Sequence, residues 1–361
     1  MRLDELRRLA SRRRLDMILA CTPPSVRAFA GIACDNAVLR VVRAPTASAR
    51  PSRARVALYT DFRYVPMVHR VAPTLACRDL RRLKVEGRRI GFESSIAYAQ
   101  YLRLKRLAGR GAAFVDVAKD LAAIRAVKTP EEIAGLRAAE RLTCEIWAAA
   151  RARFEAGMTE RQMVRIVRTL MVARGDGEAF DTIVCVGKNA AECHHEPDDT
   201  VWDGREPVLV DMGVRLDGFC SDLTRNLVPG LLDASGTAGR HGPSPLYRQV
   251  YGLVREANRA AIAAARPGLT GRQLDKVARD VIARGGFGRF FGHSLGHGVG
   301  YEIHEAPYAS RRSDTVLKPG MVVTIEPGVY LEGRLGVRIE DLVLITENGC
   351  EVLSLADGEE N

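Results

Sequence analysis

Residues 1 to about 124 alternate between short apolar segments and helical patterns. The apolar segments include DMILA, VALYT and RRIGFES, and amphipathic stretches such as YAQYLRLKRLAG separate them. Strands that alternate with helices predict a small α/β domain. The first residues, MRLDELRRLASRRRLDMILA, predict a helix that leads into a strand, because acidic residues interrupt the arginines and no signal-peptide pattern follows.

A second pattern begins at KTPEEIAGLRAAE, where helix-start signals are concentrated. Thr129 is a candidate N-cap, Pro130 stands at the first helical position, and Glu132 completes a capping box. We therefore place a domain boundary just before this segment, which predicts domains at residues 1–124 and 125–361.

The second domain contains an internal repeat. AGMTERQMVRIVRTLMVARGDG (156–177) and PGLTGRQLDKVARDVIARGGFG (267–288) share a glycine, a Thr-x-x-Gln capping box and an amphipathic helix that ends in Ala-Arg-Gly. Each copy follows an Ala-rich helix and precedes β-like segments that carry histidines and carboxylates. The repeat predicts two similar halves about an approximate two-fold axis, joined by the Gly-, Ser- and Pro-rich segment at 230–245.

Composition narrows the class of protein. The chain has 361 residues, of which 47% are hydrophobic, which is enough for the cores of two domains. Its formal charge of +10 comes mostly from arginines spread along the chain, so it predicts a basic surface and no nucleic-acid groove. No apolar run is long enough for a membrane span. The eight cysteines form no CxxC pair, which favours structural thiols in a reduced, cytoplasmic protein.

Each half of the second domain supplies two acids on strand-like sequence: Asp211 and Asp222, then Glu326 and Glu340. Asp211 closes the apolar run VLVD, and Glu326 follows VVTI. Alternation in VRIEDLVLI places Glu340 among aliphatic neighbours and on the same face as Arg338, a natural partner for a neighbouring acid. Buried carboxylates repel one another unless cations neutralise them, and such an oxygen-rich set suits paired ions of the Mn²⁺ type.

Three of the seven histidines, His293, His297 and His304, fall within the stretch GHSLGHGVGYEIHE. His293 and His297 have the spacing of a zinc-protease helix, but each of the nearby glycines would destabilise such a helix by about 1 kcal/mol. Glycines instead permit a short irregular or strand segment from which imidazoles can converge. The stretch therefore predicts a metal ligand together with acid/base groups.

These motifs resemble the pita-bread metallopeptidases, specifically the proline-specific Xaa-Pro dipeptidases (prolidases) and Xaa-Pro aminopeptidases (aminopeptidase P). The resemblance covers nearly the whole chain. The motifs are LVDMGVRLDGFCSDLTRN, HSLGHGVGYEIHEAP, KPGMVVTIEPGVY and GVRIED, together with YTDFRY in the N-terminal domain. It implies an α+β catalytic domain with pseudo-two-fold halves around a curved antiparallel sheet, preceded by a smaller α/β creatinase-type domain. It also implies a homodimer.

The resemblance further implies two divalent metal ions, with Mn²⁺ expected and Co²⁺ or Zn²⁺ as alternatives. Asp211 would chelate one ion, Asp222 and Glu340 would bridge both, and His297 with Glu326 would complete the second.

Other residues take roles around these ions by the same resemblance. His304 would hydrogen-bond the scissile carbonyl, His293 and His194 would orient the substrate, and Glu326 would shuttle the proton. His195 is expected to be non-catalytic, since neighbouring residues on an extended segment point in opposite directions.

The implied activity is metal-assisted hydrolysis of the Xaa-Pro bond in dipeptides or short peptides, with aminopeptidase P activity on longer peptides as the alternative. Candidate binders of the substrate carboxylate are Arg338, Arg311 and Arg312. A non-catalytic peptide-binding relative is the alternative from another class. Retention of all five ligand positions disfavours it and also disfavours a creatinase, and the N-terminal domain disfavours a methionine aminopeptidase. Neither nucleic acid nor membrane is an expected partner.

Overall fold

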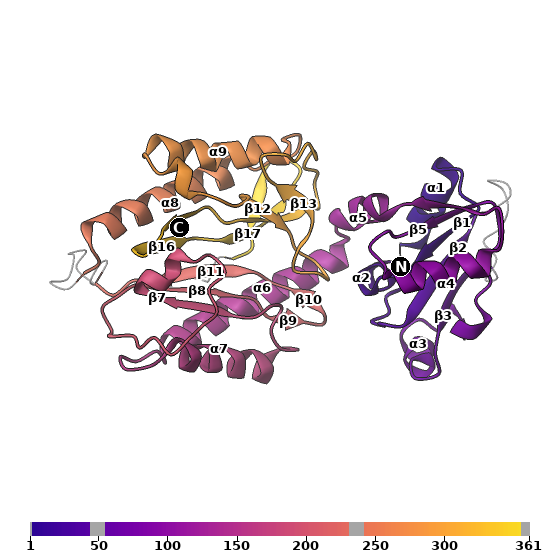
Figure 1. Cartoon of the computed structure of the whole chain (residues 1–361), viewed down its shortest axis with the longest axis horizontal. Coiled ribbons are helices and arrows are strands. Elements are labelled where there is room, and N and C mark those ends of the chain that lie inside the picture. Colours follow the sequence, from indigo (N-terminus) through magenta and orange to yellow (C-terminus); the bar gives the residue numbers. More distant parts are fainter. Residues whose placement is uncertain (1, 44–54, 231–241, 355–361) are drawn as a thin grey trace. The chain divides into compact units, whose positions relative to one another are not determined.

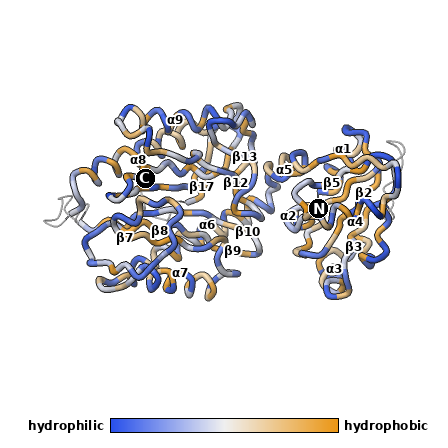
Figure 2. The backbone as a smooth tube through the Cα atoms, in the orientation of Figure 1, coloured by the Kyte–Doolittle hydropathy of each residue, from blue (hydrophilic) through white to orange (hydrophobic). Residues whose placement is uncertain are grey.

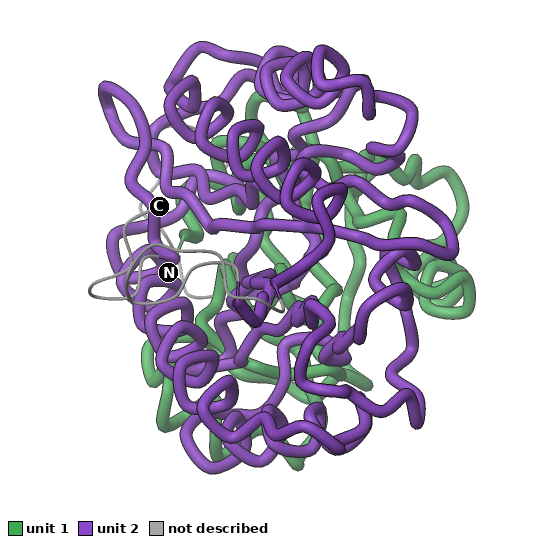
Figure 3. Tube along the Cα trace, turned by 90° about the vertical axis from the view of Figure 1, so that its left-hand side faces the viewer, with its two compact units in different colours: residues 1–125 green, residues 126–361 purple. Residues whose placement is uncertain are grey.

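The computed structural model describes residues 2–43, 55–230 and 242–354. The chain divides into two compact units, residues 1–125 and 126–361 (Figure 3). Most of the linker predicted at 230–245 lies outside the described residues.

The first unit is a mixed six-stranded sheet with strand order β4-β3-β2-β1-β5-β6 (Figure 1). Its strands are β1 (Met17–Ala20), β2 (Ala37–Val42), β3 (Val56–Thr60), β4 (Ala76–Asp79), β5 (Arg89–Phe92) and β6 (Ala113–Asp116). Its helices are α1 (Leu3–Arg12), α2 (Pro23–Ala30), α3 (Val65–Val71), η2 (Leu80–Arg82), α4 (Tyr98–Ala108) and α5 (Ala118–Ala126). Successive β1 residues enter two different apolar clusters, so both faces of the sheet are covered. The predicted α/β domain and its first helix are confirmed.

The second unit begins with a half made of two helices over an antiparallel sheet of order β11-β8-β7. Its elements are α6 (Pro130–Arg151), α7 (Glu160–Arg174), β7 (Ile183–Val186), η3 (Gly187–Ala191), β8 (Val208–Met212), β9 (Arg215–Leu216), β10 (Phe219–Cys220) and β11 (Leu223–Leu227). One apolar cluster joins α6 and α7 to this sheet.

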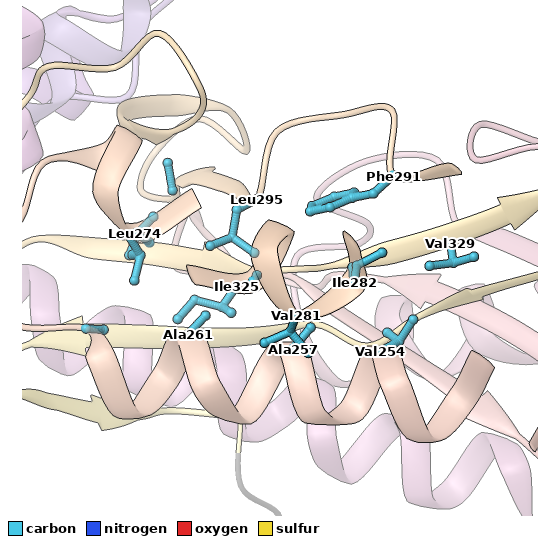
Figure 4. Packing of buried hydrophobic residues seen from close by; sticks show 14 of the residues in the cluster. Val254, Ala257, Ala261, Leu274, Val281, Ile282, Phe291, Leu295, Ile325 and Val329 are labelled. Carbon is cyan, nitrogen blue, oxygen red and sulfur yellow. The ribbon is translucent and has the colours of Figure 1, made fainter. Parts of the chain in front are cut away.

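The other half repeats this plan with α8 and α9 over an antiparallel sheet of order β13-β12-β14-β17-β18. Its elements are α8 (Pro245–Ala264), α9 (Gly271–Arg284), η4 (Gly288–Phe290), β12 (Gly296–Gly298), β13 (Glu305–Ala309), β14 (Val322–Ile325), β15 (Gly328–Leu331), β16 (Leu335–Arg338), β17 (Asp341–Ile345) and β18 (Cys350–Val352). Val254, Ala257 and Ala261 of α8 lie in one apolar cluster with Ile325 and Val329 (Figure 4). Both α7 and α9 show hydrophilic and hydrophobic stretches, as amphipathic helices over a sheet should (Figure 2).

The two halves meet where β11 runs beside the segment that joins β16 to β17. The backbone N–H of Glu340 donates to the carbonyl of Thr224 at 3.2 Å, and the Asn226 side chain donates to the Arg338 carbonyl at 2.7 Å. Acids from both halves therefore reach the same region.

Three helices begin with complete capping boxes, which confirms the predicted helix starts. In each, the threonine hydroxyl oxygen accepts a hydrogen bond from the backbone N–H of the third helical residue. The side chain of that third residue accepts one from the backbone N–H of the threonine. The pairs are Thr129 with Glu132, Thr159 with Gln162, and Thr270 with Gln273.

Two further findings concern the cysteines and the helices. All eight cysteines are free thiols. No helix in the described part of the chain is both long and apolar enough to cross a membrane.

Candidate metal centre

A cavity of about 510 Å³ lies in the second unit and gathers the predicted site residues. Its walls include the five predicted metal ligands, the three predicted histidines and one candidate carboxylate binder: Asp211, Asp222, His297, Glu326, Glu340, His194, His293, His304 and Arg338. Arg311 and Arg312, the other two candidate carboxylate binders, are exposed and do not line this cavity. The sequence halves thus converge on one site.

Asp211, on β8, is held by an arginine from the other half. The Arg338 guanidinium donates to Asp211 Oδ2 at 2.6 Å, and only 5% of the Arg338 side chain is exposed. The same guanidinium donates to Thr224 Oγ1, to the Tyr330 hydroxyl and to the Cys193 carbonyl. The guanidinium of Arg338 is thus already engaged by protein acceptors. Its predicted role in binding the substrate carboxylate stays a prediction.

Glu340 receives the reciprocal support from the first half. Thr224 Oγ1 donates to Glu340 Oε2 at 2.7 Å while it accepts from Arg338 Nε at 3.0 Å. Glu340 is 2% exposed, although it lies between β16 and β17 rather than within a strand. A single threonine therefore orients one acid and the arginine that holds another.

Glu326 and His297 are positioned by a threonine of their own half. Thr324 Oγ1 donates to Glu326 Oε1 at 3.1 Å and accepts from the His297 backbone N–H at 3.0 Å. His297 lies on β12, so the prediction that this stretch is not helical is confirmed. Its Nδ1 donates to the Gly298 carbonyl, which leaves Nε2 without a proton and 3.5 Å from Asp222 Oδ2. That nitrogen is directed at the acids as a metal-ligand nitrogen would be.

The acids crowd one another so closely that burial and repulsion disfavour their ionised forms. Burial raises the pKa of Glu326 to about 8. Burial and the neighbouring carboxylates raise the pKa of Asp222 and that of Glu340 well above their ordinary values. Behind Asp222, the fully buried Glu140 accepts from the Asp222 backbone N–H, and burial raises its pKa to about 7.

These residues fit divalent cations. Ligand atoms of Asp222, His297 and Glu340 lie within 4.8 Å of one another. Asp211 Oδ1 is buried and has no hydrogen-bond partner among the described residues. A buried acceptor left unpaired is costly, and a cation beside it removes that cost. The mixture of carboxylate oxygens with one imidazole suits Mn²⁺-like or Zn²⁺-like ions.

His293 is committed to protein partners on both ring nitrogens. Its Nδ1 donates to the Ser294 carbonyl at 2.8 Å, and its Nε2 accepts from the Tyr330 hydroxyl at 2.9 Å. Burial and the nearby Arg338 charge lower its pKa to about 4, so the ring is neutral. His293 thereby belongs to the network that holds Asp211, and its role toward substrate stays a prediction.

His194 and His304 are exposed cavity residues, one from each half. The ring of His304 lies 4.4 Å from that of His297, measured between centroids. His195 differs from its neighbour, because it is 9% exposed and its Nε2 lies 2.8 Å from Glu160 Oε2.

Sequence reasoning missed four supporting residues: Thr224, Thr324, Tyr330 and Glu140. Thr324 lies two residues before Glu326, so strand alternation places it on the face of the acid that it contacts. Thr224 lies two residues after Asp222, but the acid that it contacts is Glu340, 116 positions away. Glu140 stands on the apolar face of α6, where an unexplained charge was itself a signal. Tyr330 gave no comparable signal.

Known proteins resemble this chain over both units. Residues 134–347 match metallopeptidase family M24, and residues 2–127 match the creatinase/prolidase N-terminal domain. An Xaa-Pro dipeptidase of Pyrococcus furiosus is 38% identical over 273 residues, which are 75% of this chain and 74% of that protein.

Two solved structures extend the resemblance to nearly the full length. The Xaa-Pro dipeptidase from Bacillus anthracis is 30% identical with a TM-score of 0.86, covering 99% of this chain and 98% of that one. The X-Pro aminopeptidase from Thermotoga maritima MSB8 is 29% identical with a TM-score of 0.83, covering 98% of each chain.

Proposed function

Since the chain belongs to metallopeptidase family M24, we infer that it is a metal-dependent peptidase that hydrolyses the Xaa-Pro bond of dipeptides or short peptides. The family predicted from the motifs and the predicted pita-bread fold are confirmed. One observation carries the proposal: four acids and an imidazole converge on one cavity, and a buried Asp211 oxygen there has no hydrogen-bond partner in the part of the chain that the structure describes.

We assign the metal-holding role to Asp211, Asp222, His297, Glu326 and Glu340, with two Mn²⁺ ions as the proposed occupants and Co²⁺ or Zn²⁺ as alternatives. Such ions supply Lewis acidity for the scissile carbonyl and acidify water near neutral pH.

The protein residues carry the proton and the substrate. Glu326, oriented by Thr324, accepts a proton from the attacking water and returns it to the proline nitrogen of the leaving group. His304 donates a hydrogen bond to the carbonyl oxygen as negative charge develops there. His194 faces the substrate from the opposite half.

Selection for proline follows from shape, because an Xaa-Pro bond offers no N–H to an acceptor. Phe180, Ile183 and Ile303 supply apolar surface to the same cavity as the acids. A cavity of about 510 Å³ has the size of a small-molecule site and favours a dipeptide over a long chain. A homodimer and a cytoplasmic location remain part of the proposal.

The test is an assay of metal-free protein with added Mn²⁺ on Ala-Pro, Ala-Ala and Ala-Pro-Ala-Ala. We expect Ala-Pro to be cleaved only with metal and at least about 100-fold better than Ala-Ala, a discrimination of about 3 kcal/mol. Preferential cleavage of Ala-Pro-Ala-Ala would replace dipeptidase activity with the aminopeptidase alternative. Peptide binding without turnover would instead identify a non-catalytic relative.

A further inference from the structure

The residue that follows each exposed cavity histidine is buried in an ion pair. The sequences HHEP and HEAP, at 194–197 and 304–307, place His195 and Glu305 in corresponding positions. Both side chains are buried, although the preceding histidine is exposed in each case. We refer to the two ion pairs as the anchor pairs: Lys128–Glu305 and Glu160–His195.

The Lys128 anchor pair lies behind His304. The side chains of Lys128 and Glu305 are 3% and 4% exposed, and the ammonium contacts Glu305 Oε1. Lys128 is itself fixed, because its backbone N–H donates to the Gly320 carbonyl at 2.8 Å. A Cβ at Gly300 would lie 2.5 Å from Glu305 Oε1 and 2.7 Å from Lys128 Nζ, so the loop is closely packed on the pair.

The Glu160 anchor pair has the opposite polarity. His195 Nε2 faces Glu160 Oε2 at 2.8 Å, and its Nδ1 faces Glu192 Oε2 at 3.2 Å. Although burial acts in the opposite direction, the hydrogen bonds to Glu160 and Glu192 raise the pKa of His195 above its ordinary value. Glu160, which is fully buried, also accepts from the Val186 backbone N–H and the Asn189 side chain. Its oxygens are therefore saturated by protein donors, and the pair is structural rather than a second metal site.

The histidines beside the anchor pairs lack such restraints. Within the described ranges, the rings of His194 and His304 have no hydrogen-bond partner. The backbone therefore sets the position from which each ring enters the cavity, and the His304 ring in addition packs edge-on against that of His297. A displacement of about 1 Å at a reacting group can lower a rate about 100-fold.

We propose that the two anchor pairs are positioning devices, each of which fixes the backbone from which a cavity histidine reaches the substrate. The two pairs are built with reversed polarity: Glu305 follows His304 and meets Lys128, which lies just before α6 of the first half, whereas His195 follows His194 and meets Glu160 of the same half. This inference rests on the proposed peptidase function and adds positioning residues to it.

A double-mutant cycle tests the Lys128 anchor pair. In wild-type background, Lys128→Met should lower kcat on Ala-Pro about tenfold or more while KM changes within about twofold. In His304→Ala background, the same change should alter kcat by less than about threefold, since the histidine to be positioned is gone. Equal losses in both backgrounds would overturn the proposal for this pair.

The Glu160 anchor pair is tested in the same way with His195→Gln and His194→Ala. Gln keeps a polar side chain but cannot donate to two carboxylates from a ring. The matched control for loss of stability is Val254→Ala, a truncation in the α8 core. It should lower Tm without changing kcat, and a kcat loss as large as that of the anchor variants would overturn the proposal.

A spectroscopic readout separates this proposal from the proposed activity. The imidazole NMR resonances of the zinc-loaded protein, assigned with the His194→Ala and His304→Ala variants, report ring environment without any turnover. Lys128→Met should shift or broaden the His304 resonance and leave that of His194 in place; His195→Gln should do the converse. Unchanged resonances in both variants would refute positioning, whether or not Ala-Pro is hydrolysed, whereas shifted resonances in a protein that cleaves no Xaa-Pro bond would refute only the function.

Discussion

The two halves of the second unit share a plan but support each other's acids. Each half contributes a capped helix over a sheet and two acids from strand ends. Yet Arg338 of the second half holds Asp211 of the first, and Thr224 of the first holds Glu340 of the second. The two halves therefore depend on each other, because each supplies a side chain that holds an acid of the other.

The halves differ in what they hold locally. In the second half, Thr324 orients both Glu326 and His297 without help from the first. In the first half, Asp222 depends on Glu140, a buried acid that accepts from its backbone N–H. The second half thus orients its acid and imidazole through one threonine, whereas the first half supports Asp222 through a buried acid on α6.

The largest expected effect comes from removing one acid from either half. Asp222→Asn and Glu340→Gln should each lower kcat/KM about 10³-fold, because each variant loses several kcal/mol of charge stabilisation. Metal analysis of the purified variants should show less bound metal than wild type. Asp181→Asn, at a fully exposed acid on the cavity rim, is the control and should retain both activity and metal. Full activity in either Asp222→Asn or Glu340→Gln would contradict the prediction that the site needs an acid from each half.

The crosswise link through Arg338 ranks next. Arg338→Lys keeps the charge but cannot reach Asp211, Tyr330 and Thr224 together, because lysine lacks the planar fork. Supporting groups of this kind typically change metal affinity 10–100-fold, and a loss of about that size is expected in a metal titration. Arg137→Lys, in a surface ion pair with Glu351, should change nothing. Unaltered affinity in Arg338→Lys would mean that the first half holds Asp211 unaided.

Stability of the metal-free protein should depend on pH in a defined direction. The pKa of Glu326 is raised to about 8 and that of Glu140 to about 7, so the folded state binds more protons than the unfolded state below these values. The free energy of unfolding should therefore fall by about 2 kcal/mol as pH rises from about 6.5 to 8. Below about 6.5 the depressed pKa values of His293 and His297 oppose this trend.

Thermal unfolding of chelator-treated protein across this pH range measures the effect. Added Mn²⁺ should abolish most of the pH dependence of stability, because the cations neutralise the acids. Glu140→Gln should remove the part of the pH dependence that comes from Glu140. A metal-free protein whose Tm rises between pH 6.5 and 8 would contradict the crowding of ionised carboxylates.

A smaller effect is expected from removing the threonine hydroxyls that orient the site acids. Thr224 supports an acid of the other half, and Thr324 supports an acid of its own half. Thr224→Val and Thr324→Val are isosteric, and each removes a hydroxyl that donates to a site acid. Thr224→Val should cost more, about 2 kcal/mol against about 1, because its oxygen also accepts from the buried Arg338 guanidinium. The measurement is kcat/KM at saturating Mn²⁺ for both variants. A larger loss in Thr324→Val would show that local support dominates.

The smallest effect should be equal in both halves. Thr159→Ala and Thr270→Ala each remove one capping-box hydroxyl and should lower the free energy of unfolding by about 1 kcal/mol without changing kcat. Urea unfolding followed by circular dichroism measures both. Because the halves are interlocked, each variant should shift one common transition. Two separate transitions would show that the halves unfold independently.

The helix starts, the repeated halves and the candidate acids could be predicted from sequence pattern because their signals are local, whereas the fold family and the ligand roles came from the family resemblance. Capping boxes, apolar runs that end in an acid, and the glycines around His297 each specify structure within a few residues. The crosswise contacts could not be predicted, because Arg338 and Asp211 are 127 positions apart. Pattern alone does not say which acid an arginine will meet.

The anchor pairs illustrate the same limit. Alternation predicts that His195 points away from its neighbour His194, but it does not identify the partner Glu160, which lies 35 positions earlier, on a helix. Nothing in the sequence pattern links Lys128 with Glu305, which lie 177 positions apart. Only packing revealed that both are buried.

Two groups of the candidate site come late in the chain. Glu340 and Arg338 lie beyond α9, near the end of the described residues, so a nascent chain still short of them has neither the last acid nor the clamp for Asp211. A polypeptide that ends before Arg338 would therefore lack two groups of the proposed metal centre, although it would still contain every other predicted ligand.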